Sequence, residues 1–128
     1  MYRLLIAISL IGVFFAALAC TAGASTPATQ QPSVDPNALS ISARNIAFST
    51  DTLSAPAGRP FQIVFDNQES APHNVAIYRD LAARDSVFVG EVFPGPRVVV
   101  YEVPALEPGT YQFICDVHPS MEGILTVR

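Results

Sequence analysis

The sequence predicts an all-β protein: a Greek-key β-sandwich of about eight strands. Its apolar segments are short and rich in Val, Ile, Phe and Tyr, and Gly, Pro, Asn and Asp interrupt them at close intervals. Beyond the N-terminal region, no segment repeats its apolar residues with the period of a helix. Closely spaced short strands that alternate with turn residues are typical of an antiparallel sandwich, which is therefore the expected architecture.

The expected strands follow one another along the C-terminal two thirds of the chain. FQIVFDN (61–67) carries the clearest signal, because Phe61, Ile63 and Phe65 share one face of a strand. The remaining strands are LSISARNIAF (39–48), TLSA (52–55), HNVAIY (73–78), VFVGEVF (87–93), RVVVYEV (97–103), GTYQFICD (109–116) and GILTVR (123–128). RDLAARDS (79–86) is the one candidate for a helix, and we expect it to form a loop or a single turn instead.

Residues 1–19 are expected to be a signal peptide. Arg3 supplies the short positive region, the apolar run LLIAISLIGVFFAALA follows it, and small residues lead on to Cys20. The run is close in length to a short membrane span, so an uncleaved anchor is also open. Each of these alternatives places the rest of the chain outside the cytoplasm.

The residues around Cys20 leave the processing of this segment open. ALAC (17–20) resembles the bacterial lipobox, which predicts a lipidated Cys20 as the new N-terminus, although Leu18 lies one place nearer the cysteine than usual. Cleavage after Ala19 or Ala24 also satisfies the small-residue rule. We expect a periplasmic or cell-surface protein, held at the membrane through Cys20 where the lipobox is used.

A tether and one folded domain are expected after the signal peptide. Residues 20–37 are rich in Ser, Thr, Ala, Pro and Gln and show no apolar periodicity, which predicts a flexible connection. Residues 38–128 then form the domain, since about 90 residues suffice for a single hydrophobic core.

The charge of the chain excludes some classes of partner. The formal net charge of the whole sequence is −4; without residues 1–19, six arginines face eleven acidic residues, and there is no lysine. An acidic surface with scattered arginines argues against nucleic acid and anionic lipid headgroups as partners. We expect a monomer whose partners are other proteins.

Cys115 is the one cysteine of the expected domain, and it has no partner for a disulfide. Cys20 is lipidated, removed with the signal peptide or kept in the anchor. An unpaired thiol in an oxidising compartment is a liability unless something protects it or uses it. Strand alternation places Cys115 on the same face as Tyr111 and Phe113, so its sulfur is expected to point inward.

The stretch CDVHPSM (115–121) brings three candidate metal ligands close together in the sequence. Cys115 offers a thiolate, His118 an imidazole and Met121 a thioether, and two residues separate each from the next. One tight loop can therefore turn all three towards a single point. His73, the only other histidine, can complete the set. Two histidines, a cysteine and a weak axial methionine are the donor set of a blue-copper electron-transfer site.

Other interpretations of these residues fit less well. A structural zinc site favours four strong ligands, and a thioether is a poor one. A second copper centre would need further cysteines or histidines that the domain lacks. A Cys–His hydrolase would need an activated thiol and an oxyanion hole in a cleft. The remaining alternative is a tight turn with a buried, unused thiol. Because the hydrolase interpretation fits less well, an enzyme is not expected.

Two segments resemble those of a known family. PHNVAI (72–77) and YQFICDVHPSMEGILTV (111–127) are similar to segments of the cupredoxins, the small blue copper proteins. The plastocyanin and amicyanin branch is the most similar, and the spacing Cys-x2-His-x2-Met matches the short ligand loop of the amicyanins. The resemblance implies an eight-stranded Greek-key sandwich over residues 38–128, with one type 1 copper at one end.

The resemblance also implies a role for each matching residue. His73 and His118 would be the nitrogen ligands, Cys115 the thiolate and Met121 the axial thioether. Asn74 matches the asparagine that follows the first histidine in this family, and its side chain would tie together the two segments that carry the ligands.

One departure from the family pattern concerns the residue two places after the cysteine. Plastocyanins and amicyanins typically carry proline there, whereas this chain has Val117. Valine has the backbone N–H that proline lacks, and we expect it to reach the Cys115 sulfur. A hydrogen bond to the thiolate would favour the electron-rich reduced state of the site.

The resemblance implies a one-electron carrier that exchanges electrons with extracytoplasmic or membrane-bound redox partner proteins through transient contacts. Two alternatives use the same fold. A copper carrier or buffer would deliver the metal itself to another protein, and an interaction domain would keep the fold without binding metal. The chain lacks the Met-rich or His-rich tracts that are expected of a copper carrier.

Overall fold

The computed structural model of the protein describes residues 33–80, 82 and 84–128. The expected signal peptide (1–19), Cys20 and the larger part of the expected tether lie outside the described residues. No helix among the described residues has both the length and the apolar character needed to cross a bilayer.

Ten strands and no helix make up the described part of the chain, which confirms the all-β class. The strands are β1 (Leu39–Ala43), β2 (Thr52–Ala55), β3 (Phe61–Asn67), β4 (Pro72–His73), β5 (Ala76–Asp80), β6 (Asp85–Val89), β7 (Phe93–Pro94), β8 (Arg97–Val103), β9 (Gly109–Ile114) and β10 (Glu122–Val127). Two expected strands prove to be divided: 73–78 becomes β4 and β5, and 87–93 becomes β6 and β7. Residues 79–86, the helix candidate, contain the end of β5 and the start of its antiparallel partner β6.

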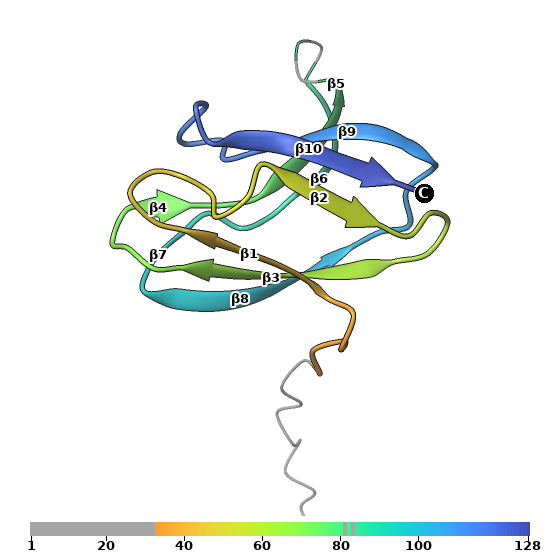
Figure 1. Ribbon diagram of the computed structural model, residues 1–128. Coiled ribbons are helices and arrows are strands. Elements are labelled where there is room, and N and C mark those ends of the chain that lie inside the picture. The colour runs from red at the N-terminus through yellow and green to blue at the C-terminus, as the bar shows by residue number, and fades with distance from the viewer. Residues whose placement is uncertain (1–32, 81, 83) are drawn as a thin grey trace, which may run out of the picture.

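The strands form two facing sheets with the hydrophobic core between them (Figure 1). One sheet has the order β1-β3-β8 and the other the order β2-β10-β9-β5-β6. β4 and β7 make a separate two-stranded ladder at one end of the sandwich, and the loop between β9 and β10 lies at the same end. The expected sandwich is confirmed.

Two strand pairs run parallel, which differs from the antiparallel pairing that the sequence predicted. β1 pairs with β3 so that Ile41 lies opposite Phe65, and β2 pairs with β10 so that Leu53 lies opposite Leu125. The chain leaves one sheet after β1 and joins the edge of the other as β2. Apolar alternation reports the face that a residue occupies but not the direction of the neighbouring strand, so the sequence held no signal for these pairs.

The core confirms the alternation expected for β3. Phe61, Ile63 and Phe65 are buried, and the Phe65 ring packs against the rings of Phe93 and Tyr101, with centroids 5.6 and 6.0 Å away. Close packing of this kind leaves side chains little freedom to shift. The strands that leave this packed core therefore have fixed ends.

Residues 33–37, the end of the expected tether, hydrogen-bond to β3. The Gln62 side chain donates to the Ser33 carbonyl (3.1 Å) and accepts the Asp35 N–H (2.6 Å). The Asp35 carboxylate in turn accepts the Asn37 N–H (2.7 Å), which makes a tight turn before β1. The chain is therefore attached to the domain a few residues ahead of β1.

Candidate metal centre

The loop between β9 and β10 holds Cys115, His118 and Met121 in two consecutive turns. The His118 N–H donates to the Cys115 carbonyl (3.1 Å), and the Met121 N–H donates to the His118 carbonyl (2.8 Å). The Cys115 N–H donates to the Met121 carbonyl (2.9 Å) and so closes the loop at its base. A hydrogen bond between residues three apart closes a β-turn, and this explains the two-residue spacing between the three side chains.

His73 reaches the same end of the sandwich from β4. Its pairing with Phe93 of β7 places it in the short ladder at that end, and its side chain is completely buried. The chain then leaves the ladder for two residues, and β5 resumes with Ala76 opposite Ile114 of β9. The pairing of β5 with β9 therefore carries the His73 segment to a position next to Cys115.

The two imidazoles and the thiol converge on one point. The Cys115 Sγ lies 3.6 Å from His73 Nδ1 and 3.8 Å from His118 Nδ1, and the two Nδ1 atoms lie 3.1 Å apart. Cys115 and His73 are buried, whereas His118 is partly exposed. The structure thus brings together three of the residues that the sequence indicated, from segments 42 residues apart.

A single metal ion fits this triangle of donor atoms. With bonds of about 2.0 Å to nitrogen and about 2.3 Å to sulfur, the lengths known for zinc, a trigonal arrangement places the donor atoms about 3.5–3.7 Å apart. The observed edges of the triangle, 3.1, 3.6 and 3.8 Å, are close to these values. A soft thiolate together with imidazole suits copper, so both the size and the chemistry of the donor set fit a copper ion.

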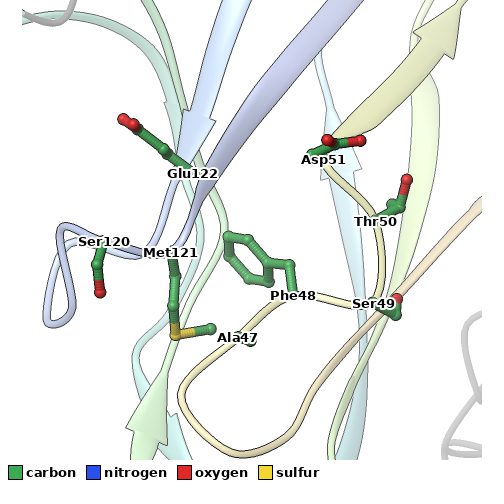
Figure 2. A pocket seen from close by; sticks show the side chains of 8 residues that line it. All are labelled: Ala47, Phe48, Ser49, Thr50, Asp51, Ser120, Met121 and Glu122. Atoms are coloured by element: carbon green, nitrogen blue, oxygen red, sulfur yellow. The ribbon is translucent and has the colours of Figure 1, made fainter.

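Met121 is buried beside the loop, with 2 % of its surface exposed, and it belongs to the same hydrophobic cluster as Cys115. Figure 2 shows its side chain directed towards Ala47, next to Phe48, at one wall of a pocket of about 370 Å³. The Met121 side chain is therefore buried in the hydrophobic cluster, beside a pocket that polar side chains also line. Its part in binding a metal stays a prediction.

Asn74 joins the His73 segment to the Cys115 loop. Its side chain is completely buried, its Nδ2 donates to the Gly90 carbonyl (3.1 Å) and to Asp116 Oδ2 (2.9 Å), and its Oδ1 accepts the Asp116 N–H (2.9 Å). Two of these bonds join the residue after His73 to the residue after Cys115. Whether this link matters to a bound metal stays a prediction.

Sequence reasoning missed Asp116 and Tyr78. The Tyr78 hydroxyl donates to Asp116 Oδ1 (2.9 Å), while Oδ2 of the same carboxylate accepts the hydrogen bond from Asn74. The hydrogen bond to this carboxylate, aided by burial, raises the pKa of Tyr78 above its ordinary value. The pairing of β5 with β9 brings these side chains together, and such a long-range contact leaves no mark in a local sequence pattern.

Sequence reasoning also missed Glu69, whose carboxylate lies against the outer nitrogen of His73. Glu69 Oε1 is 2.8 Å from His73 Nε2, and the Glu69 side chain is 23 % exposed. A hydrogen bond from the Ile46 N–H is the main cause that holds the pKa of Glu69 below its ordinary value, and the contact with His73 adds to it. Glu69 lies in a loop, where a spacing of four residues predicts no contact.

Val117 lies on the outer side of the ligand loop, with 42 % of its surface exposed. The side-chain contacts of the Cys115 sulfur within hydrogen-bonding range are to His73 and His118. The hydrogen bond expected from the Val117 N–H to the sulfur stays a prediction.

Comparison with known proteins identifies relatives of this chain. The cupredoxin-like domain family matches residues 9–127. Amicyanin-alpha of Methylorubrum extorquens is 27% identical over 121 residues, which cover 92% of this chain and 92% of that protein. Amicyanin of Paracoccus versutus is 28% identical over 95 residues, which cover 74% of this chain and 68% of that protein.

Two solved auracyanin structures have a similar fold. The structure of dithionite-reduced auracyanin from Roseiflexus castenholzii has a TM-score of 0.64 at 20% identity and covers 75% of this chain and 99% of its own. Auracyanin A from Chloroflexus aurantiacus, described as a "blue" copper protein, has a TM-score of 0.63 at 22% identity and covers 71% of this chain and 98% of its own. At these identities the two structures show that the fold is shared.

Proposed function

Because this chain belongs to the cupredoxin-like domain family, we propose that it is a one-electron carrier with one type 1 copper, and not an enzyme. One observation carries the proposal: the Cys115 sulfur and the Nδ1 atoms of His73 and His118 form a triangle of the size that one metal ion needs. The amicyanin relatives and the auracyanin described as a blue copper protein support it. Met121 is proposed as the weak axial ligand.

The role of the protein chain in electron transfer is to hold the ligand side chains in fixed positions. Copper held by His73, Cys115 and His118 would supply a one-electron couple, which needs no bond in the chain to be made or broken. His73 and Cys115 are buried, and the loop of Cys115 is closed by its own backbone hydrogen bonds. Because these side chains have little room to move, one ligand arrangement serves both oxidation states.

His118 is proposed as the point where electrons enter and leave. Its ring is partly exposed, whereas His73 and Cys115 are buried. Its neighbours in the loop, Val117 and Pro119, are apolar and exposed. Exposed apolar residues beside a ligand suit brief, weak encounters with redox partner proteins, which bury little area.

The proposed location is outside the cytoplasm, with a lipid on Cys20 that holds the protein at the membrane. The segment 20–37 would then act as the tether, with Ser33 and Asp35 near its end hydrogen-bonded to Gln62 of β3, and residues 38–128 as the copper domain. A tether of this kind raises the effective concentration of the domain near membrane-bound partners. The domain is proposed to act as a monomer.

The test of the proposed function is to add Cu(II) to the purified metal-free protein. We expect an intense blue thiolate-to-copper absorption band, a narrow copper hyperfine splitting and a reversible one-electron wave in voltammetry. Colourless protein that binds no copper would instead indicate an interaction domain without metal. Ready transfer of copper to a metal-free acceptor, without a reversible wave, would indicate a copper carrier or buffer.

Met121→Gln is expected to keep copper bound and to lower the reduction potential. An amide oxygen is a stronger axial donor than a thioether and favours Cu(II). A tenfold relative gain for Cu(II) corresponds to about 59 mV in a one-electron couple. Voltammetry measures the shift, and Met121→Leu, which removes the donor and keeps the volume, should move the potential the opposite way. A potential in Met121→Gln at or above that of the parent protein would contradict an axial role for Met121.

Val117→Pro is expected to lower the reduction potential by a smaller amount. Proline removes the N–H that is expected to donate to the Cys115 sulfur, and this loss favours Cu(II). A hydrogen bond worth about 1 kcal/mol corresponds to about 40 mV for one electron. Val117→Ala keeps the N–H and is the matched control, with an unchanged potential. If Val117→Pro leaves the potential unchanged or raises it, the Val117 N–H has no such role.

A further inference from the structure

The two ring nitrogens of His73 face different partners. Nδ1 points into the triangle with Cys115 and His118, whereas Nε2 lies 2.8 Å from Glu69 Oε1. An ionised carboxylate can only accept hydrogen bonds, so Nε2 carries the hydrogen and donates it to Glu69. The lone pair of Nδ1 is then directed at the centre of the triangle.

The turn 44–47 also holds the Glu69 carboxylate. The Asn45 N–H donates to Oε2 (3.0 Å), and the Ile46 N–H donates to Oε1 (2.9 Å). Oε1 therefore accepts one hydrogen bond from the turn and one from His73. Hydrogen bonds to a charged acceptor are the strong ones, and three of them leave the carboxylate a single orientation.

Both central residues of this turn have a positive φ, which is unfavourable for Ile46. Asn45 and Ile46 have φ of 56° and 54°, and Arg44 and Ala47 exchange both backbone hydrogen bonds, as in a type I′ turn. Asparagine tolerates positive φ, but a β-branched residue rarely adopts it and keeps it only where the surroundings hold it. The bond from the Ile46 N–H to Glu69 is one such constraint.

The turn 44–47 also lies beside the proposed axial ligand. In Figure 2 the Met121 side chain is directed towards Ala47, the last residue of the turn. The turn 44–47 therefore places Ala47 near Met121 and also donates two backbone hydrogen bonds to the Glu69 carboxylate.

Asn67 and Gly95 fix the backbone of Glu69. The buried Asn67 side chain accepts the Glu69 N–H (3.1 Å) and donates to the carbonyls of Ala71 (2.9 Å) and Phe93 (3.0 Å). The Gly95 N–H donates to the Glu69 carbonyl (2.9 Å), and a Cβ at Gly95 would lie only 2.6 Å from that carbonyl oxygen. Hydrogen bonds thus hold both the side chain and the backbone of Glu69 in place.

We propose that Glu69 is a positioning residue for copper ligation through His73. It selects the ring form in which Nδ1 is free to bind, holds the ring in one orientation and places a negative charge that favours Cu(II) over Cu(I). This inference rests on the proposed function. Hydrogen-bond partners of metal-binding histidines typically contribute about 10–100-fold to metal affinity, which sets the effect to be measured.

The first experiment needs no copper and compares Glu69→Ala and Glu69→Gln with the parent protein. Nitrogen-15 NMR of the His73 ring, in weakly alkaline buffer, shows which nitrogen carries the hydrogen. We expect the Nε2–H form in the parent protein and in Glu69→Gln, and a mixture of both forms in Glu69→Ala. An undisturbed Nε2–H form in Glu69→Ala would overturn the positioning role. Because the readout is taken without metal, it is independent of whether the chain proves to be an electron carrier.

The second experiment loads the variants with copper. Glu91→Gln is added as the charge control, because it also removes one carboxylate charge, here one that lies near Arg97 (3.8 Å). We expect Glu69→Ala to lose about 10–100-fold in copper affinity and Glu69→Gln to recover part of it. The reduction potential should rise in both Glu69 variants and stay near the parent value in Glu91→Gln. Equal affinities and potentials in Glu69→Ala and Glu91→Gln would overturn the proposal.

Glu69→Gln also tests the proposed role of Glu69 if Glu69→Ala fails to fold. Glutamine keeps an oxygen for the His73 Nε2–H but carries no charge, and its amide NH2 faces the Asn45 N–H, another donor. A raised potential with the Nε2–H form retained supports the proposed charge effect. A parent-like potential in this variant contradicts it.

Discussion

Replacing Cys115 with serine is expected to abolish the intense blue absorption of the copper-loaded protein. The band requires charge transfer between a thiolate and copper, and Cys115 is the free cysteine of the described residues. A serine hydroxyl is a hard donor that stays protonated, so it replaces neither the charge nor the softness of the thiolate. We expect copper affinity to fall by more than the roughly 10–100-fold typical of losing an outer hydrogen-bond partner.

Absorption and electron paramagnetic resonance spectra of the copper-loaded variant measure this result. Ser120→Ala is the matched control, because Ser120 belongs to the same loop and is exposed, and this variant should keep the band. Circular dichroism of both metal-free variants checks that the sandwich still forms around the buried position 115. A Cys115→Ser protein that still turns blue would show that the proposed thiolate ligand is wrong.

The ligand loop could be predicted because its information is local. Cys115, His118 and Met121 are separated by single β-turns, so their spacing in sequence already reports their proximity in space. The inward direction of Cys115 followed from the alternation of Tyr111 and Phe113, and all three side chains are buried. Local periodicity and turn chemistry are properties of adjacent residues and can be read without the fold.

His73 could be indicated only because the chain has so few histidines and because PHNVAI (72–77) resembles a segment of the cupredoxins. Its distance of 42 residues from Cys115 holds no local pattern. The partners around it show the limit of that reasoning. Glu69 and Asp116 are two of several acidic residues in the chain, and strand pairing and a tight turn, not spacing, place them at the site. A sequence with many candidate carboxylates gives no basis for choosing these two.

The division of the segment 73–78 into two strands also depends on contacts between residues far apart in the sequence. The run HNVAIY alternates like one strand, but Asn74 turns its side chain inward to bond Gly90 and Asp116, and the ladder breaks there into β4 and β5. A buried polar side chain with three hydrogen bonds outweighs local strand propensity. The interruption that the sequence could not predict is therefore the one that links the two ligand segments.

Asn74→Ala is expected to lower the free energy of unfolding of the metal-free protein by about 3 kcal/mol. The substitution removes three hydrogen bonds and leaves the buried Gly90 carbonyl and the partly buried Asp116 N–H without their side-chain partner. It also leaves a small cavity between the His73 segment and the Cys115 loop. Urea denaturation followed by circular dichroism measures the loss.

Asn74→Ala should also loosen the copper site, because the Asn74 side chain joins the segment of His73 to Asp116, the residue after Cys115, through two hydrogen bonds. We expect a wider copper hyperfine splitting and slower electron exchange than in the parent protein. Tyr78→Phe is the control: it removes one hydrogen bond to Asp116, leaves those of Asn74 intact and should cost about 1 kcal/mol without changing the copper spectrum. If Asn74→Ala costs no more than Tyr78→Phe and its spectrum is unchanged, the backbone alone holds the two segments together.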